Sequence, residues 1–271
     1  MTGSGLISGS LVVQDGVAPG GIVTASGGST TRGFGGHVAS LALTAAYQTV
    51  PQEMSVQHVH VEFLRPAVAG PSVEVPVTVI RDGRTTAHRL VEVRQADGRA
   101  VASVLAVFHR ADAAGLEYQV PVTPGPGPEG STEVRTSPME IRLDEDVRDP
   151  SRQRVWIRSA ERPLPTDPRL HDSVLLFMSD VSVLWPALRV HGFDVMEHRH
   201  SALSSMTHTM WFHRHVQADR WLLYDQQTPS TAGGLCHSEG RIFTADGLLA
   251  ASVTQVGLLQ PTQGGPGTRT R

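Results

Sequence analysis

The hydrophobic positions of the chain fall into two similar series, and each series predicts one helix followed by several strands. Small and apolar residues fill positions 35–50 without leaving a polar face, which is typical of a helix that is buried nearly all round. A second apolar stretch of helical length covers residues 170–192. A buried helix followed by antiparallel strands favours an α+β fold, in which a sheet curls about the helix. The apolar and polar residues that follow predict strands at 55–64, 72–80, 85–95 and 99–109, and again at 205–216, 220–227, 234–244 and 248–259.

The two series are related by a short internal repeat. The run "ADGRAVASV" begins at Ala96 and "ADGLLAASV" begins at Ala245, and "FLR" at Phe63 matches "FHR" at Phe212, so both matches have an offset of 149 residues. Two matches at one spacing and in one order indicate two copies of one unit. We expect the matching strands to be related by a pseudo-twofold axis.

A segment rich in proline and glycine separates the two copies. Its centre, "TPGPGPEGST", is incompatible with a helix or a strand, which indicates an exposed connection. We therefore predict an N-terminal repeat over 1–110, a linker over 111–152 and a C-terminal repeat over 153–260. The glycine-rich and proline-rich end, 261–271, is predicted to be a disordered tail.

Composition and charge exclude several classes of protein. A net charge of −3 gives no basic surface for nucleic acid. The apolar windows are interrupted by polar residues and proline, so we expect no membrane span, and the first residues lack the basic start of a signal peptide. The single cysteine, Cys236, excludes an internal disulfide and fits a reducing compartment, so we expect a cytoplasmic protein.

Six stretches of the chain resemble the acyl-CoA thioesterase II family, and they cover most of 32–110 and 156–260. They are "FGGHVASLAL", "HVEFLRPAVAG", "RDGRTTAHRLVEVRQADGRAVASVLAVF", "MSDVSVLWPALRVHG", "HTMWFHRHVQADRWLLYDQQTPSTAGG" and "GRIFTADGLLAASVTQVGLL". The resemblance implies a double hotdog fold, in which two fused repeats each have a long helix wrapped by a curled antiparallel sheet. It also implies an enzyme that hydrolyses acyl-CoA to free acid and CoA, with no cofactor. We expect this enzyme to be a homo-oligomer of two or more chains.

The same resemblance implies three site residues that bind and activate one water molecule. Asp180 in "MSDVSVL" matches the family's aspartate, Ser205 in "SMTHTMWFH" matches its hydroxyl residue, and Gln255 in "SVTQVG" matches its glutamine. Ser204 is the alternative to Ser205. For Asp180 the alternative role is a helix cap or an ion pair with an arginine, and for Gln255 it is an exposed position on an edge strand.

The chemistry of these residue types fits direct attack by water. A carboxylate at the floor of an apolar cleft can act as a general base, because burial raises its pKa toward neutral pH. A hydroxyl and an amide can hold the water or a neighbouring group. The oxyanion would need N–H donors, and we expect Gly35 or Gly36 in "GFGGH" to provide one.

Histidine and cysteine patterns point to no other kind of site. His58 and His60, like His213 and His215, are two residues apart, so each pair shares a strand face. No cysteine or carboxylate lies at a ligand-like offset from them, and we expect no metal site. Cys236 is followed directly by a histidine, and adjacent strand residues point to opposite faces, which argues against a cysteine nucleophile.

The chain departs from the family pattern at three positions: His37 stands for the usual glutamine, Thr207 for an aspartate and His215 for a proline. The changes at Thr207 and His215 leave open a catalytically silent protein that binds acyl-CoA. A second alternative is a hydratase or dehydratase on the same fold, although the Asp-x-Asn-Pro-x-His-like run typical of such enzymes is absent. By the offset of 149, Val56 corresponds to Ser205 and Ala106 to Gln255. We therefore predict one working site and no second copy of it.

Overall fold

The structure is a computed structural model that describes residues 7–23, 32–110, 115–135, 138–145, 147–198 and 203–260. The first half contains α1 (Ile7–Ser10), β1 (Val17–Ala18), α2 (Gly35–Tyr47), β2 (Met54–Phe63), β3 (Val73–Glu74), β4 (Val77–Asp82), β5 (Thr86–Arg94) and β6 (Ala100–Arg110). The second half contains η1 (Pro128–Gly130), β7 (Thr132–Arg135), β8 (Met139–Leu143), β9 (Arg152–Ser159), α3 (Pro168–Ser179), α4 (Trp185–Arg189), α5 (Val195–His198), β10 (Leu203–Phe212), β11 (Leu222–Ala232), β12 (Leu235–Thr244) and β13 (Leu249–Leu259). Across the described ranges, no helix has the length and hydropathy needed to cross a bilayer.

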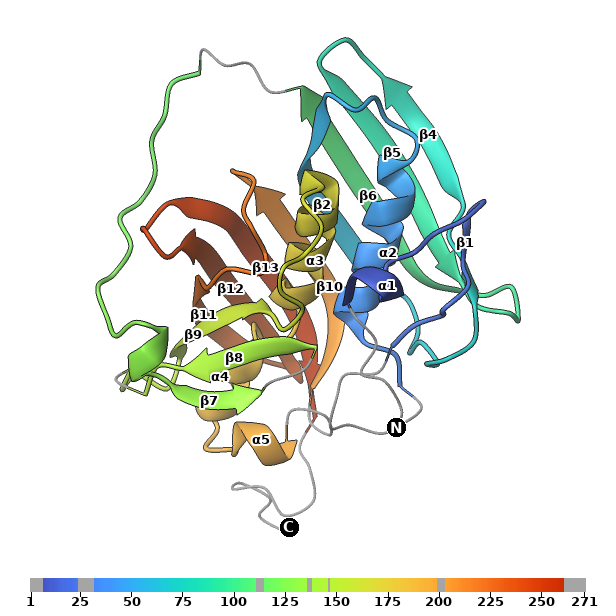
Figure 1. The fold of residues 1–271 in the computed structure, drawn as a ribbon. Helices are drawn as coiled ribbons and strands as arrows, with labels where there is room; N and C mark the ends of the chain where they lie inside the picture. The colour runs from blue at the N-terminus through green and yellow to red at the C-terminus, as the bar shows by residue number, and fades with distance from the viewer. Residues whose placement is uncertain are drawn as a thin grey trace, which may run out of the picture.

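The strands form one antiparallel sheet that runs through both halves. In the described residues it has 13 strands in the order β1-β3-β5-β6-β2-β10-β13-β12-β11-β9-β8-β7, with β4 paired to β5. The sheet curves around α2 and α3, and these two helices lie side by side (Figure 1). This arrangement confirms the predicted α+β fold.

The offset of 149 residues relates the central strands of the two halves from end to end. It carries β2 onto β10 and β6 onto β13 without any change in length. β2 and β10 pair with each other, with His60 opposite Thr209, Val59 opposite Met210 and Val61 opposite His208. That register is symmetric about the His60–Thr209 pair, as a twofold axis between the strands requires.

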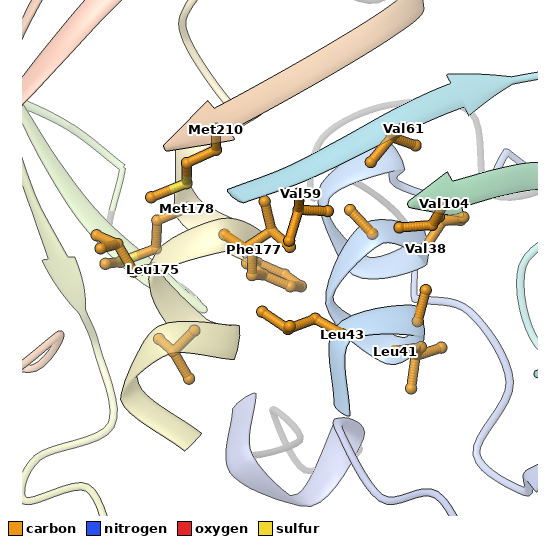
Figure 2. Packing of buried hydrophobic residues seen from close by; sticks show 14 of the residues in the cluster. Val38, Leu41, Leu43, Val59, Val61, Val104, Leu175, Phe177, Met178 and Met210 are labelled. Atoms are coloured by element: carbon orange, nitrogen blue, oxygen red, sulfur yellow. The ribbon is translucent and has the colours of Figure 1, made fainter. Parts of the chain in front are cut away.

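The hydrophobic core lies between the two long helices and the inner face of the sheet. All residues of α2 except Gly35 and Thr44 are buried, which agrees with the prediction of a helix without a polar face. Gly36 allows close approach of the helices, because a Cβ there would lie 2.4 Å from the carbonyl oxygen of Phe177. Figure 2 shows side chains of α2 and α3 gathered with others from β2, β6 and β10.

Proline divides two of the predicted elements. The predicted strand at 72–80 is divided into β3 and β4, and Pro76 lies between them without an N–H for the sheet. The predicted helix at 170–192 is also divided, because α3 ends at Ser179 and Pro186 lies in the first turn of α4. The interruption leaves Asp180 at the C-cap of α3 rather than inside a helix.

The segment predicted as a linker contains more regular structure than its composition indicated. Residues 115–127 have no helix or strand, but η1, β7 and β8 follow. β8 pairs with β9, and β7 pairs with β8 at the edge of the sheet. The second half of the predicted linker, 111–152, therefore contains strands that the sequence did not predict, while the bounds of the two repeats and the linker stay a prediction. The predicted tail, 261–271, lies outside the described residues.

Candidate active site

Asp180, Ser205 and Gln255 meet where the end of α3 lies over β10 and β13. Gln255 Nε2 donates to Asp180 Oδ1 at 2.8 Å and lies 2.7 Å from Ser205 Oγ. Ser205 Oγ donates to Asp180 Oδ1 at 3.3 Å. The structure therefore brings together all three side chains, which come from three different elements.

The two alternatives for the polar residues do not fit these contacts. Ser204 is directed elsewhere, because its Oγ accepts from Arg32 Nη2 at 2.8 Å. Gln255 is only 1% exposed, and β13 lies between β10 and β12 rather than at an edge. The hydroxyl that reaches Asp180 is thus that of Ser205.

The N-terminus of α2 faces the carboxylate of Asp180. The backbone N–H of Gly36 donates to this carboxylate. A Cβ on Gly35 would lie 2.8 Å from Asp180 Oδ2, so this approach requires glycine. The positive end of the α2 dipole stabilises the negative charge. Because the N–H of Gly36 is used in this contact, only Gly35 remains as a predicted oxyanion donor.

Burial dominates the electrostatics of Asp180. Its side chain is 4% exposed, and the loss of hydration raises the pKa of the carboxyl above the ordinary value for aspartate. The hydrogen bonds from Gln255, Gly36 and Ser205 oppose this rise, and so would a positive charge on nearby His208 if its ring were protonated. The result is a carboxylate that can take a proton more readily than one in water.

His208 belongs to the same cluster, although the sequence analysis did not select it. Its Nδ1 lies 2.5 Å from Gln255 Oε1, and its Nε2 lies 2.9 Å from Ser179 Oγ. Burial lowers the pKa of His208, which favours the neutral ring. A neutral ring with its proton on Nδ1 donates to Gln255 Oε1. This contact turns the amide nitrogen of Gln255 toward Asp180 and Ser205.

A β-bulge explains how His208 comes to share a face with Ser205. Residues three apart in a regular strand point to opposite sides of the sheet. The register of β10 shifts between Ser205 and Thr207, so Met206 is an extra residue and the later side chains change face. His208 is then directly opposite Gln255 in the ladder.

A cavity of about 590 Å³ opens beside Asp180 and Ser205. Gln255 does not line it and supports the other two residues from behind. Binding of one water by all three side chains stays a prediction. The cavity wall is mainly apolar, with two arginines, and includes Phe34, Val38, Phe63, Leu184, Trp185, Arg32 and Arg65.

The departures from the family pattern lie outside this cluster. Thr207 Oγ1 accepts from the backbone N–H of Val256 at 3.3 Å. His215 contacts Asp172 instead, with Nδ1 and Oδ1 3.1 Å apart. Val56 and Ala106, the counterparts of Ser205 and Gln255, are both buried apolar residues. Among the described residues, no group of three or more His, Cys, Asp or Glu side chains is arranged to hold a metal ion.

Comparison with known proteins gives matches along nearly the whole chain. The family model of the acyl-CoA thioesterase N-terminal domain matches residues 24–109, and that of the C-terminal domain matches residues 114–259. Acyl-coenzyme A thioesterase 8 of Homo sapiens is 27% identical over 263 residues, which cover 84% of this chain and 81% of that protein.

Solved structures agree with these matches. The structure of acyl-CoA thioesterase II TesB2 from Mycobacterium marinum is 33% identical with a TM-score of 0.81, over 95% of this chain and 99% of that one. A protein with a hot dog fold from Alicyclobacillus acidocaldarius is 20% identical with a TM-score of 0.75, over 94% of this chain and 98% of that one. The predicted double hotdog fold is thereby confirmed, and the chain belongs to the acyl-CoA thioesterase family.

Proposed function

We propose that this protein hydrolyses acyl-CoA thioesters to free acid and CoA, and that Asp180 is the general base for direct attack by water. The observation that carries the proposal is a buried carboxylate at the wall of a mainly apolar cavity, hydrogen-bonded by Ser205 and Gln255. The names of the relatives support the same reaction.

The reaction requires one proton transfer and one bond exchange. Asp180 takes a proton from water while the water oxygen bonds to the thioester carbonyl carbon. The C–S bond then breaks, and the CoA sulfur leaves as a thiolate or takes the proton back from Asp180. A general base of this kind contributes roughly 10²–10⁴-fold to the rate.

The other residues of the cluster have positioning roles in this proposal. Ser205 lines the cavity beside Asp180 and can hold the attacking water. Gln255 fixes both residues, and His208 fixes Gln255. Gly35 is the first residue of α2, where a backbone N–H has no partner within the helix, and it supplies a donor for the oxyanion.

The cavity also offers complementary surfaces for the two parts of the substrate. Its apolar wall, which includes Phe63 and Trp185, suits an acyl chain. Arg32 and Arg65 line the same cavity and suit the phosphates of CoA, because guanidinium groups bind phosphate by paired hydrogen bonds.

The test is release of free thiol from a series of acyl-CoA substrates by the wild-type chain and by Asp180→Asn. We expect the variant to keep its fold and to lose roughly 10²-fold or more of kcat, because an amide cannot accept the proton. Asp225→Asn is the matched control, since Asp225 pairs with Arg152 across strands β11 and β9 and does not line the cavity beside Asp180. Retention of more than half of kcat by Asp180→Asn would exclude Asp180 as the base.

The same assay separates the two other candidate functions. Binding of acyl-CoA without thiol release by the wild-type chain would indicate a silent binding protein. Addition of water to an enoyl-CoA without thiol release would indicate a hydratase. The cytoplasmic location and the homo-oligomer stay predictions.

A further inference from the structure

A second polar cluster joins the end of α2, the first half of α3, the start of β2 and the segment after β10. His215 Nδ1 lies 3.1 Å from Asp172 Oδ1, and His215 Nε2 lies 2.9 Å from Ser55 Oγ. Tyr47 donates to the other carboxylate oxygen of Asp172 at 2.6 Å. The three groups therefore form a continuous chain of hydrogen bonds from carboxylate to imidazole to hydroxyl.

This cluster lies at the pseudo-symmetric counterpart of the candidate active site. The offset of 149 that relates β2 to β10 carries Ser55 onto Ser204, next to Ser205. Tyr47 is the last residue of α2, and Asp180 directly follows the last residue of α3, so each lies at the C-terminal end of a long helix. Neither Ser55 nor His215 lines the cavity beside Asp180, so the two clusters are separate.

The burial of each member suits activation of the hydroxyl. Asp172 is only 2% exposed and is held by Tyr47, whose oxygen also accepts from the backbone N–H of Val56 at 3.0 Å. His215 is half-exposed, and its hydrogen bond to Asp172 raises its pKa. Ser55 is partly exposed, so its hydroxyl is open to an incoming reactant. A fixed carboxylate that orients an imidazole beside an accessible hydroxyl is the arrangement that activates a serine nucleophile.

Other pairs of histidine and hydroxyl in the described residues lack one of these properties. His60 contacts Thr209 Oγ1 and Glu62 Oε1, but there the hydroxyl is buried and the carboxylate is half-exposed. His213 Nε2 lies 2.9 Å from Ser252 Oγ, and no carboxylate contact accompanies this pair. The cluster at Ser55 thus combines a buried carboxylate with an accessible hydroxyl.

We propose that Ser55, His215 and Asp172 form a second acyl-transfer site, which hydrolyses small carboxylic esters through an acyl-serine intermediate. With the His215 Nδ1–H bonded to Asp172, Nε2 is free to take the Ser55 proton as Oγ bonds to the ester carbonyl carbon. The ester C–O bond then breaks, and the leaving oxygen takes the proton from His215, or departs as an anion while His215 releases the proton to solvent. Water then gives a proton to His215 as its oxygen bonds to the acyl carbon. The bond between the acyl carbon and Ser55 Oγ breaks, the acid leaves, and His215 returns the proton to Ser55.

Small esters are the substrate class that this geometry favours. Ser55 and His215 are accessible from outside and lie at the end of the helix pair rather than in the apolar cavity. A short acyl group needs no cavity of its own. An aryl ester is the suitable probe, because its leaving group departs without a proton and the rate then reports the attack by Ser55.

The experiment uses p-nitrophenyl acetate and the full chain with Asp180→Asn, which removes the proposed base of the other site. We expect measurable release of p-nitrophenol that falls roughly 10²-fold when Ser55→Ala or His215→Ala is added. Ser252→Ala is the matched control, because it removes the hydroxyl of a histidine pair that lacks a carboxylate, and we expect it to change nothing. Circular dichroism checks that each variant is folded.

Chemical labelling gives a second readout that does not depend on turnover. Diisopropyl fluorophosphate reacts with an activated serine by forming an O–P bond and releasing fluoride. We expect peptide mass spectrometry to find the adduct on Ser55, and to find much less of it when His215 is replaced by alanine. Absence of an adduct on Ser55, or equal ester hydrolysis with and without the Ser55 hydroxyl, would overturn the proposal.

Discussion

Acidification is expected to destabilise this protein through His37, which lies in the first turn of α2. The side chain is fully buried, and both ring nitrogens have backbone partners: Val23 N–H donates to Nδ1 at 2.9 Å, and Nε2 donates to Ser10 O at 2.9 Å. Burial lowers the pKa of His37 from about 6.5 to about 4. A second proton on Nδ1 would also face the N–H of Val23.

The magnitude follows from the difference between the folded and unfolded chains. Above pH 6.5 both forms hold a neutral ring, and the stabilisation is fully present. As pH falls from 6.5 to about 4, the unfolded chain takes up a proton that folded His37 does not. At about 1.4 kcal/mol for each pH unit, the loss of stability reaches about 3 kcal/mol near pH 4.

Urea unfolding at a series of pH values, compared with His37→Gln, measures this loss. Glutamine can accept from Val23 N–H and donate to Ser10 O, but it does not titrate. The other titrating groups are the same in both chains. The difference in free energy of unfolding between the wild-type chain and His37→Gln therefore isolates the contribution of His37. The stability of the wild-type chain should fall more steeply between pH 6.5 and 4. Parallel curves for the two chains would refute a buried, neutral His37.

Three further expectations concern the site. Ser205→Ala should lower kcat for thiol release less than Asp180→Asn does. Ser204→Ala should alter KM alone, because the Ser204 hydroxyl accepts from Arg32 at the cavity wall rather than contacting Asp180; the reverse order would move the hydroxyl role to Ser204. Gly35→Ala should reduce kcat roughly 10-fold or more, because its Cβ would lie 2.8 Å from Asp180 Oδ2, and an unchanged kcat would show that α2 can shift without cost. Cys236→Ala should leave kcat unchanged and the wild-type thiol should resist iodoacetamide at neutral pH, since burial raises its pKa to about 11; rapid alkylation with loss of activity would contradict this.

Sequence patterns predicted those parts of the fold that repeat or alternate regularly. The offset of 149 placed β2, β6, β10 and β13 correctly, because each is a long strand with one buried face. The strands β7 and β8 were not predicted, since they are short strands beside a proline-rich run and gain their order from pairing: β8 pairs with β9, and β7 pairs with β8 at the edge of the sheet. Pro76 and Pro186 are visible in the sequence as residues that interrupt a strand and a helix. The residue at which the next strand or helix begins depends on packing.

The candidate site could be predicted only as far as residue types could be matched one by one. Asp180, Ser205 and Gln255 came from the family resemblance, and the structure places them in contact. His208 was missed because a regular strand would direct it away from Ser205, and no sequence signal marks Met206 as the residue of a bulge. The hydrogen bond from the Gly36 N–H to Asp180 depends on how α2 packs against α3, and a sequence pattern does not predict that packing.

The contact between β2 and β10 is self-complementary, because a half-turn about the His60–Thr209 pair exchanges the two strands. Two separate copies of one half could make the same contact as an isologous dimer, and every substitution would then occur at both ends of the helix pair. Fusion into a single chain removes that constraint, since a mutation changes one end only. A duplicated gene of this kind can retain its original chemistry at the end that carries Asp180, while the end that carries Tyr47 is free to acquire another.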